Sequence, residues 1–98
     1  MSRDEIIARL RQNEAALRQR GVAHAALFGS RARGDQQSES DTDIMIELDP
    51  TARITVLDYA GLNNYIAELF DGRVDVVNRE GLKPYIRPAV TIDAIYAF

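Results

Sequence analysis

Five residues stand at spacings that could perform chemistry on a phosphate group. Gly29 and Ser30 directly follow one short apolar stretch, and Asp41 and Asp43 lie two apart at the start of another. Asp75 lies within a third apolar stretch. Clustered carboxylates repel one another and need a counter-charge, which a pair of divalent cations supplies. These residue types therefore predict metal-assisted chemistry at a phosphate.

The ligand types predict which metal would bind. Oxygen ligands alone favour Mg²⁺, with Mn²⁺ as the alternative, over zinc, which usually recruits His or Cys. The chain has no cysteine, and His24, its one histidine, is expected to be a structural or surface residue. Two ions could activate an attacking hydroxyl and stabilise a leaving pyrophosphate. We therefore expect Asp41, Asp43 and Asp75 to be metal ligands and catalytic residues.

The Gly29–Ser30 dipeptide is suited to holding the phosphate itself. A glycine between a strand and a helix lets the backbone approach a phosphate, and N–H groups that open a helix bind anions. The serine adds a hydroxyl donor. Arg31 and Arg33 lie near enough to add positive charge. We expect one arginine to contact phosphate and the other to pair with Asp35 or Glu39.

Hydropathy periodicity predicts the elements that position these residues. Ser2 with Glu5 three residues later matches a capping box, and apolar residues then recur at helical spacing as far as Gly21. The first helix is therefore predicted over residues 2–20. The other predicted elements, in order, are a buried strand over 22–28, a turn of helix over 30–33, a strand over 41–48, a helix over 55–70, a strand over 73–78, a short helix over 84–92 and an edge strand over 94–98.

Alternation along a strand predicts which face of the sheet each side chain takes. Asp41 and Asp43 share one face, while Ile44 and Ile46 point the other way, toward a helix-covered core. Asp75 likewise opposes its apolar neighbours. If the two strands pair in register, three carboxylates converge on one open face. The element order predicts an α/β fold, in the broad α+β sense, with a mixed sheet of about four strands and helices packed mainly on one face.

Composition limits the classes of protein to consider. A chain of 98 residues with 46% apolar content fits one folded domain over residues 1–98. No apolar run approaches the roughly 18 residues of a membrane span, and the charged N-terminus has no signal core. We therefore expect no membrane partner and a cytoplasmic location. The net charge of −3 argues against a general nucleic-acid-binding protein but not against nucleotide binding.

The motif spacing resembles that of a known superfamily. Gly29-Ser30, ten residues and then Asp41-Thr42-Asp43 is similar to the GSx10DxD signature of the DNA polymerase β-like nucleotidyltransferases. The wording Gly-Ser-Arg-Ala-Arg-Gly, the later strand carboxylate and the C-terminal segment resemble its minimal nucleotidyltransferase (MntA-like antitoxin) branch over nearly the whole chain. The resemblance implies that Gly29 and Ser30 hold the triphosphate and that Asp41 and Asp43 ligate both metals. Asp75 would complete the catalytic metal site and help take the nucleophile's proton.

The resemblance also implies a reaction and a partner. The reaction is transfer of a nucleotide, AMP from ATP with two Mg²⁺ ions, to an acceptor hydroxyl. Members of this size are often encoded beside a HEPN-type toxin, an RNase, and act as its antitoxin by modifying a tyrosine. A contact-only antitoxin with a vestigial site and a small-molecule acceptor stay open as alternatives. Larger members carry a further domain for the base or the acceptor, so acceptor choice, base preference and homo-oligomer formation also stay open.

Some candidates have a purely structural interpretation. An isolated Asp-x-Asp is most often a turn or cap pair, and only the matching Gly-Ser favours a site. Asp75, considered alone, could face solvent without a role, and Glu47 is expected to be solvated. The tyrosines fall mostly at core spacings and are predicted to pack against the core: Tyr59, Tyr65, Tyr85 and Tyr96.

Overall fold

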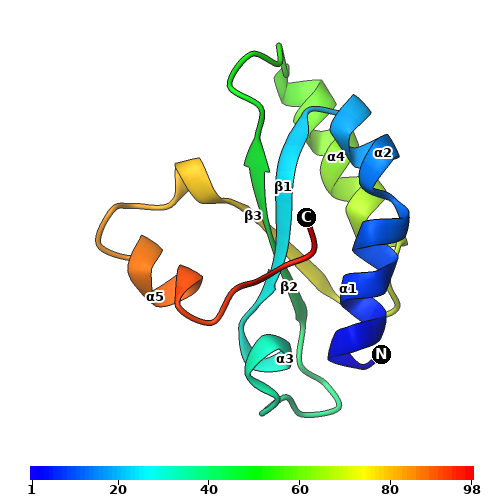
Figure 1. Cartoon of the computed structure of the whole chain (residues 1–98), viewed down its shortest axis with the longest axis vertical. Coiled ribbons are helices and arrows are strands. Elements are labelled where there is room, and N and C mark those ends of the chain that lie inside the picture. The colour runs from blue at the N-terminus through cyan, green and yellow to red at the C-terminus, as the bar shows by residue number, and fades with distance from the viewer.

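A mixed four-stranded sheet forms the centre of the computed structural model, which describes residues 1–98 (Figure 1). The strands lie in the order β3-β2-β1-β4. Strand β1 pairs antiparallel with β2 and β4, and β2 pairs parallel with β3. The bounds are β1 Val22–Phe28, β2 Thr42–Leu48, β3 Val74–Asn78 and β4 Ile95–Tyr96. The predicted class and the four-stranded mixed sheet are confirmed.

The helices are distributed unequally over the two faces of the sheet. Helices α1 (Arg3–Gln12), α2 (Glu14–Gln19) and α4 (Val56–Glu68) cover one face (Figure 1). The 3₁₀ helix η1 (Arg79–Gly81) and the short helix α5 (Arg87–Thr91) lie on the opposite side. The four-residue helix α3 (Ser30–Arg33) lies at one end of the sheet. Packing mainly on one face is as predicted, and no helix is long and apolar enough to cross a membrane.

The two long helices begin at capping boxes. The hydroxyl of Ser2 accepts a hydrogen bond from the Glu5 N–H at 3.2 Å, and the Glu5 carboxylate accepts one from the Ser2 N–H at 3.2 Å. Thr55 and Asp58 make the same reciprocal pair at the start of α4, at 3.1 Å each. Because these side chains satisfy N–H groups that have no partner within the helix, both predicted helix starts are confirmed.

The predicted first helix is interrupted at Asn13. The amide nitrogen of Asn13 donates to the Arg9 carbonyl at 2.8 Å, and its amide oxygen accepts from the Tyr65 hydroxyl at 2.9 Å. An asparagine side chain competes with the backbone for helical carbonyls, so the residue adopts a non-helical conformation. Helix α2 then ends before Gly21, which has a φ of +98°. Gly21 thus terminates the run as predicted.

The core lies between the sheet and the helices of the covered face. Apolar side chains at helical spacing on α1, α2 and α4 meet the inward side chains of β1 and β2. The members with no exposed surface in this cluster are Ile6, Leu10, Leu17, Ala25, Leu27, Ile44, Ile46, Leu62 and Ile66. The alternation predicted for β2 is therefore confirmed at Ile44 and Ile46.

The C-terminal segment departs from the sequence-based expectations. Its helix is restricted to α5, where Pro88 stands in the first turn, and β4 pairs only Ala26 with Tyr96 and Leu27 with Ile95. The predicted core packing is wrong for Tyr85 and Tyr96, which are 75% and 42% exposed. In the same segment the side chains that reach the core are Ile95, Ala97 and Phe98, so the two tyrosines lie outside it.

Candidate active site

The end of β1 brings the Gly-Ser dipeptide beside the start of β2. Phe28, the last residue of β1, is the register partner of Asp43 in the antiparallel ladder. Gly29 and Ser30 follow at once, and Ser30 begins α3. The first N–H groups of a helix lack intrahelical partners and are free to bind an anion. The pairing of β1 with β2 thus places the Gly29–Ser30 turn, which is suited to binding phosphate, next to the Asp43 carboxylate.

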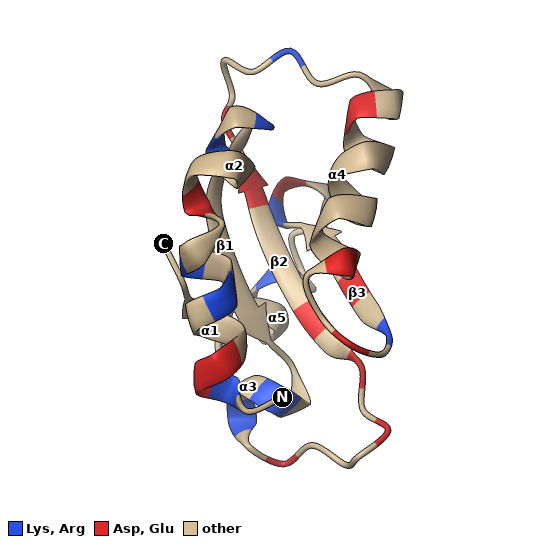
Figure 2. Ribbon diagram, turned by 90° about the vertical axis from the view of Figure 1, so that its right-hand side faces the viewer, with Lys and Arg blue, Asp and Glu red and all other residues tan.

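The parallel pairing of β2 with β3 aligns two of the predicted carboxylates. Asp43 is the register partner of Asp75, and both oppose the buried Ile44 and its partner Val76. Figure 2 shows acidic positions on the adjacent strands β2 and β3. Asp43 is half-buried and Asp75 is exposed. No basic side chain lies within ion-pairing distance of either carboxylate.

Asp41 does not complete a three-carboxylate set. It precedes the first ladder residue of β2, so strand alternation does not determine the direction of its side chain. Its Oδ1 lies 3.5 Å from the Arg73 Nε, in an exposed ion pair. No three acidic, histidine or cysteine residues stand close enough to hold a metal ion as a preformed group. The expected convergence of three carboxylates is therefore met by Asp43 and Asp75 alone.

The surroundings of Asp43 oppose its ionisation. Burial raises the pKa of its carboxyl most, and the charges of Asp75 and Asp41 raise it further. The charges of Arg31 and Arg33 act in the opposite direction. A raised carboxyl pKa next to other acids is the electrostatic condition that a bound cation relieves. The oxygen donors present therefore fit a hard divalent cation, although its ligands are not fully assembled.

Gly29 leaves space that the Asp43 carboxylate occupies. Gly29 has a φ of +76° and a ψ of −156°, a region that is almost exclusive to glycine. A Cβ added there would lie 3.1 Å from Asp43 Cγ and would collide with its Oδ2. Close phosphate approach was the predicted reason for a glycine. The structure adds a second reason, which is the placement of a carboxylate on the neighbouring strand.

The two arginines of α3 contact protein groups. Arg33 pairs with Asp35 at 3.1 Å, as expected for one of them, and also lies 3.4 Å from Asp93. Arg31 donates from Nη2 to the Ser40 carbonyl at 2.7 Å. One arginine was expected to contact phosphate, but in this conformation both guanidinium groups are bonded to protein groups. Sequence reasoning missed the Arg31 bond because a backbone carbonyl has no residue signature.

Other polar candidates lie away from the carboxylates. Glu47 accepts a hydrogen bond from the Tyr96 hydroxyl at 2.7 Å and lies 4.0 Å from Arg79, so it is engaged rather than fully solvated. His24 is exposed, as expected, with its ring 6.3 Å from that of Tyr96. Neither residue joins the Asp43–Asp75 pair.

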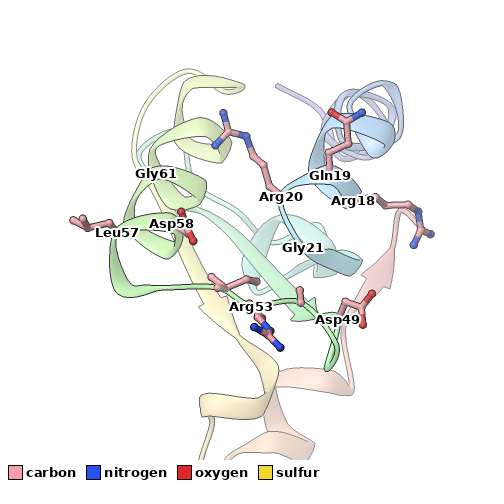
Figure 3. A pocket seen from close by; sticks show the side chains of 11 residues that line it. Arg18, Gln19, Arg20, Gly21, Asp49, Arg53, Leu57, Asp58 and Gly61 are labelled. Atoms are coloured by element: carbon pink, nitrogen blue, oxygen red, sulfur yellow. The ribbon is translucent and has the colours of Figure 1, made fainter.

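A cavity of about 500 Å³ lies at the other end of β2, where Asp49 contributes to its wall (Figure 3). Its arginines point in different directions: Arg18, Arg20 and Arg53. Arg18 already pairs with Glu14 at 2.7 Å. A second cavity of about 610 Å³ is lined by His24 and Glu47. Because neither cavity includes the Gly-Ser turn or the acidic pair, neither is the predicted site.

Comparison with known proteins agrees with this geometry. The nucleotidyltransferase domain family matches residues 7–97. The chain belongs to the nucleotidyltransferase family. It is 35% identical to a candidate protein adenylyltransferase of Methanocaldococcus jannaschii over 94% of both chains. It is 32% identical to the protein adenylyltransferase MntA of Thermococcus cleftensis, over 95% of this chain and 93% of that one.

Solved structures of nucleotidyltransferases share its fold. A candidate minimal nucleotidyltransferase is similar with a TM-score of 0.78 and 32% identity, over 97% of this chain and 95% of that chain. A toxin–antitoxin structure with AMP-PNP has a TM-score of 0.68 and 21% identity, over 90% of this chain and 72% of that chain. The second likeness shows the fold alone. The predicted branch and enzyme class are confirmed by the relatives together.

Proposed function

We propose that this nucleotidyltransferase transfers AMP from ATP to a hydroxyl of a protein acceptor. The observation that carries the proposal is the cross-strand register. The turn after Phe28 lies beside Asp43, and Asp43 lies beside Asp75. A turn suited to binding phosphate and two carboxylates without basic partners thus lie at the same end of the sheet. Relatives named as protein adenylyltransferases support a protein acceptor.

The roles of the residues follow from their positions. Gly29 and Ser30 would hold the triphosphate through backbone N–H groups and the serine hydroxyl, with Arg31 and Arg33 adding positive charge nearby. Asp41, Asp43 and Asp75 would hold two Mg²⁺ ions, or Mn²⁺ in their place. When bound, these ions would supply activation of the attacking hydroxyl and charge stabilisation of the leaving pyrophosphate.

Bonds and protons balance as in other phosphoryl-type transfers. The acceptor oxygen forms a bond to the α-phosphorus, the bond from the α-phosphorus to the bridging oxygen breaks, and pyrophosphate leaves. Asp75 is the more exposed of the paired carboxylates and is suited to accept the hydroxyl proton from an entering substrate. Positioning supplies most of the acceleration.

The proposed acceptor is a tyrosine of a HEPN-type toxin, for which this chain would be the antitoxin. The motif resemblance implies that partner class. Solved neighbours described as toxin–antitoxin complexes, one with AMP-PNP, support the setting and the nucleotide. A second proposal, a contact-only antitoxin, is favoured by one observation: the carboxylates do not form a preassembled metal site.

Calorimetric titration tests the nucleotide site. The protein is titrated with an ATP analogue that has a non-cleavable α–β bridge, once in the presence of Mg²⁺ and once in the presence of a chelator. We expect Mg²⁺-dependent binding that is lost in Asp41→Asn/Asp43→Asn and kept in Glu68→Gln, an exposed acid on α4. Absence of binding by the unaltered chain would leave the contact-only antitoxin. Label transfer from α-labelled ATP to a co-purified toxin, absent from its tyrosine-to-phenylalanine variant, then tests the acceptor.

A further inference from the structure

We propose that Arg31 is a positioning residue that sets the place of the Asp41–Asp43 segment relative to the phosphate-binding turn. The inference rests on the proposed function and assigns a separate role within that site. Arg31 stands one residue after Ser30, and it bonds to the residue immediately before Asp41. Its side chain is therefore a direct bridge between the two halves of the motif.

The bridge joins segments that have little other support. Helix α3 has four residues, too few to be stable from its own hydrogen bonds. Residues 35–39 are exposed and form neither helix nor strand. The loop closes on itself at its end, where Gln37 and Ser40 make two hydrogen bonds, at 2.8 and 3.1 Å. The Arg31 bond to the Ser40 carbonyl attaches this closed turn to α3.

Helix α3 is itself anchored to the covered side of the sheet. Arg3 on α1 donates to the Ala32 carbonyl at 3.1 Å, in a partly buried contact. On the other side of Ser40, the Thr42 N–H donates to the Arg73 carbonyl at 2.9 Å and begins the ladder. Asp41 therefore lies between a ladder bond and the Arg31 bridge. Loss of the bridge would leave the segment before Thr42 attached only on the side of Arg73, through the Thr42 ladder bond and the exposed Asp41–Arg73 ion pair.

The contacts of Arg31 differ from those of a phosphate-binding arginine. Nη1 and Nη2 both point at backbone carbonyls, those of Met1 at 3.5 Å and Ser40 at 2.7 Å. The Nε is buried. A guanidinium donating to protein carbonyls in this way fixes relative position, because its planar fork allows little freedom. Arg31 would therefore affect nucleotide binding by positioning the Asp41–Asp43 segment.

The first measurement is hydrogen exchange at the amides of residues 35–42. Arg31→Met keeps a long apolar stem and removes the donors. We expect exchange in this loop to become about tenfold faster, the size expected for losing a charge-assisted hydrogen bond, with β1 unchanged. The control is Arg11→Met, which removes a partly buried 2.8 Å bond to the Ala97 carbonyl, far from the loop in sequence. It is expected to leave loop exchange unaltered.

The second measurement separates positioning from phosphate contact. Affinity for the non-cleavable ATP analogue is determined with Mg²⁺ and with a chelator. Arg31→Met should reduce the Mg²⁺-dependent gain in affinity about tenfold, and affinity in chelator should fall only by the smaller amount that removal of one nearby positive charge causes. An equal loss in chelator would assign Arg31 to phosphate instead and overturn the proposal. Unchanged loop exchange would overturn it as well.

These readouts distinguish failure of the inference from failure of the proposed function. If the unaltered chain binds no nucleotide, the proposed function fails, while loop exchange still tests the bridge. Should Arg31→Met not fold, Arg31→Lys retains the charge but carries its donors on a single nitrogen, and it is expected to produce smaller changes in the same directions. Absence of both changes in that variant would also count against positioning.

Discussion

The surroundings of Asp43 disfavour the charged form of its carboxyl group. Burial and two neighbouring acids raise the pKa of its carboxyl, and no basic group lies within ion-pairing distance to offset them. A carboxylate placed in this way costs folding free energy until a cation binds. Residues that destabilise the fold in this manner are concentrated at functional sites. The position of Asp43 in the β2 ladder is therefore better explained by binding than by stability.

Asp43→Asn is predicted to stabilise the metal-free fold at pH 7. The folded-state pKa of Asp43 is raised, so the folded chain binds more protons than the unfolded one, and stability falls as pH rises through that pKa. The amide has no such penalty. We expect a small gain in the free energy of unfolding, reduced by solvent screening because Asp43 is only half-buried.

Denaturant unfolding in chelator measures this effect. The difference between Asp43→Asn and the unaltered chain should be present at pH 7 and disappear near pH 3, where the carboxyl is protonated in both states. Lower stability of the variant at pH 7 would show that the carboxylate makes a favourable contact instead.

At the scale of elements, the junction between β1 and α3 determines the site. Gly29 turns the chain with a φ that is rare for other residues, and it does so beside the Asp43 side chain near the start of β2. Gly34 ends α3 with a φ of +84° but faces open space. The two glycines have similar φ but differ in ψ, which is −156° at Gly29 and 13° at Gly34, and only Gly29 contacts a carboxylate.

Gly29→Ala and Gly34→Ala form a matched pair. Both should lose about 1–3 kcal/mol of stability from backbone strain, with the larger loss in Gly29→Ala because its ψ of −156° lies in the region restricted to glycine. Only Gly29→Ala adds a Cβ that displaces the Asp43 carboxylate, so only it should also lose Mg²⁺-dependent binding of the ATP analogue. Thermal unfolding and calorimetric titration measure the two effects. Equal loss of nucleotide binding in both variants would mean that strain alone disturbs the site.

At the scale of the whole molecule, the two sides of the sheet differ in the side chains that they carry. The apolar cluster lies on the side of α1, α2 and α4, whereas the acidic pair and the segment containing α5 lie on the other side (Figures 1 and 2). Large apolar side chains of the C-terminal segment remain exposed, such as Ile92 at 80%. Most of the buried apolar cluster therefore lies on the face covered by α1, α2 and α4, although Ala26 and Met45 are also buried.

Truncation of two isoleucines tests this division. Ile66→Ala removes a side chain with no exposed surface from α4 and should cost about 2–5 kcal/mol in the free energy of unfolding. Ile92→Ala should change it by less than about 0.5 kcal/mol, because that side chain is largely in solvent. Denaturant unfolding of both variants gives the comparison. A large loss in Ile92→Ala would indicate that the C-terminal segment is part of the folding core.

Local patterns in the sequence determined much of this protein. Hydropathy patterns located all four strands and α4, and the capping box at Ser2 located the start of α1. The fixed distance from Gly29-Ser30 to Asp41-x-Asp43 determined the family. These features depend on neighbours within a few residues or on a motif of constant length, so they can be predicted from the sequence alone.

Only the tertiary structure decided how the candidate residues meet. Asp41 pairs with Arg73, Arg31 bonds to the Ser40 carbonyl, and Gly29 makes room for Asp43. Each contact joins parts of the chain separated by a loop or a whole element, and the acceptor of the Arg31 bond is a backbone atom. Such contacts depend on the register of the sheet and on loop closure, which residue types and their spacing do not encode. The sequence thus predicted the candidate residues, and the fold decided which of them touch.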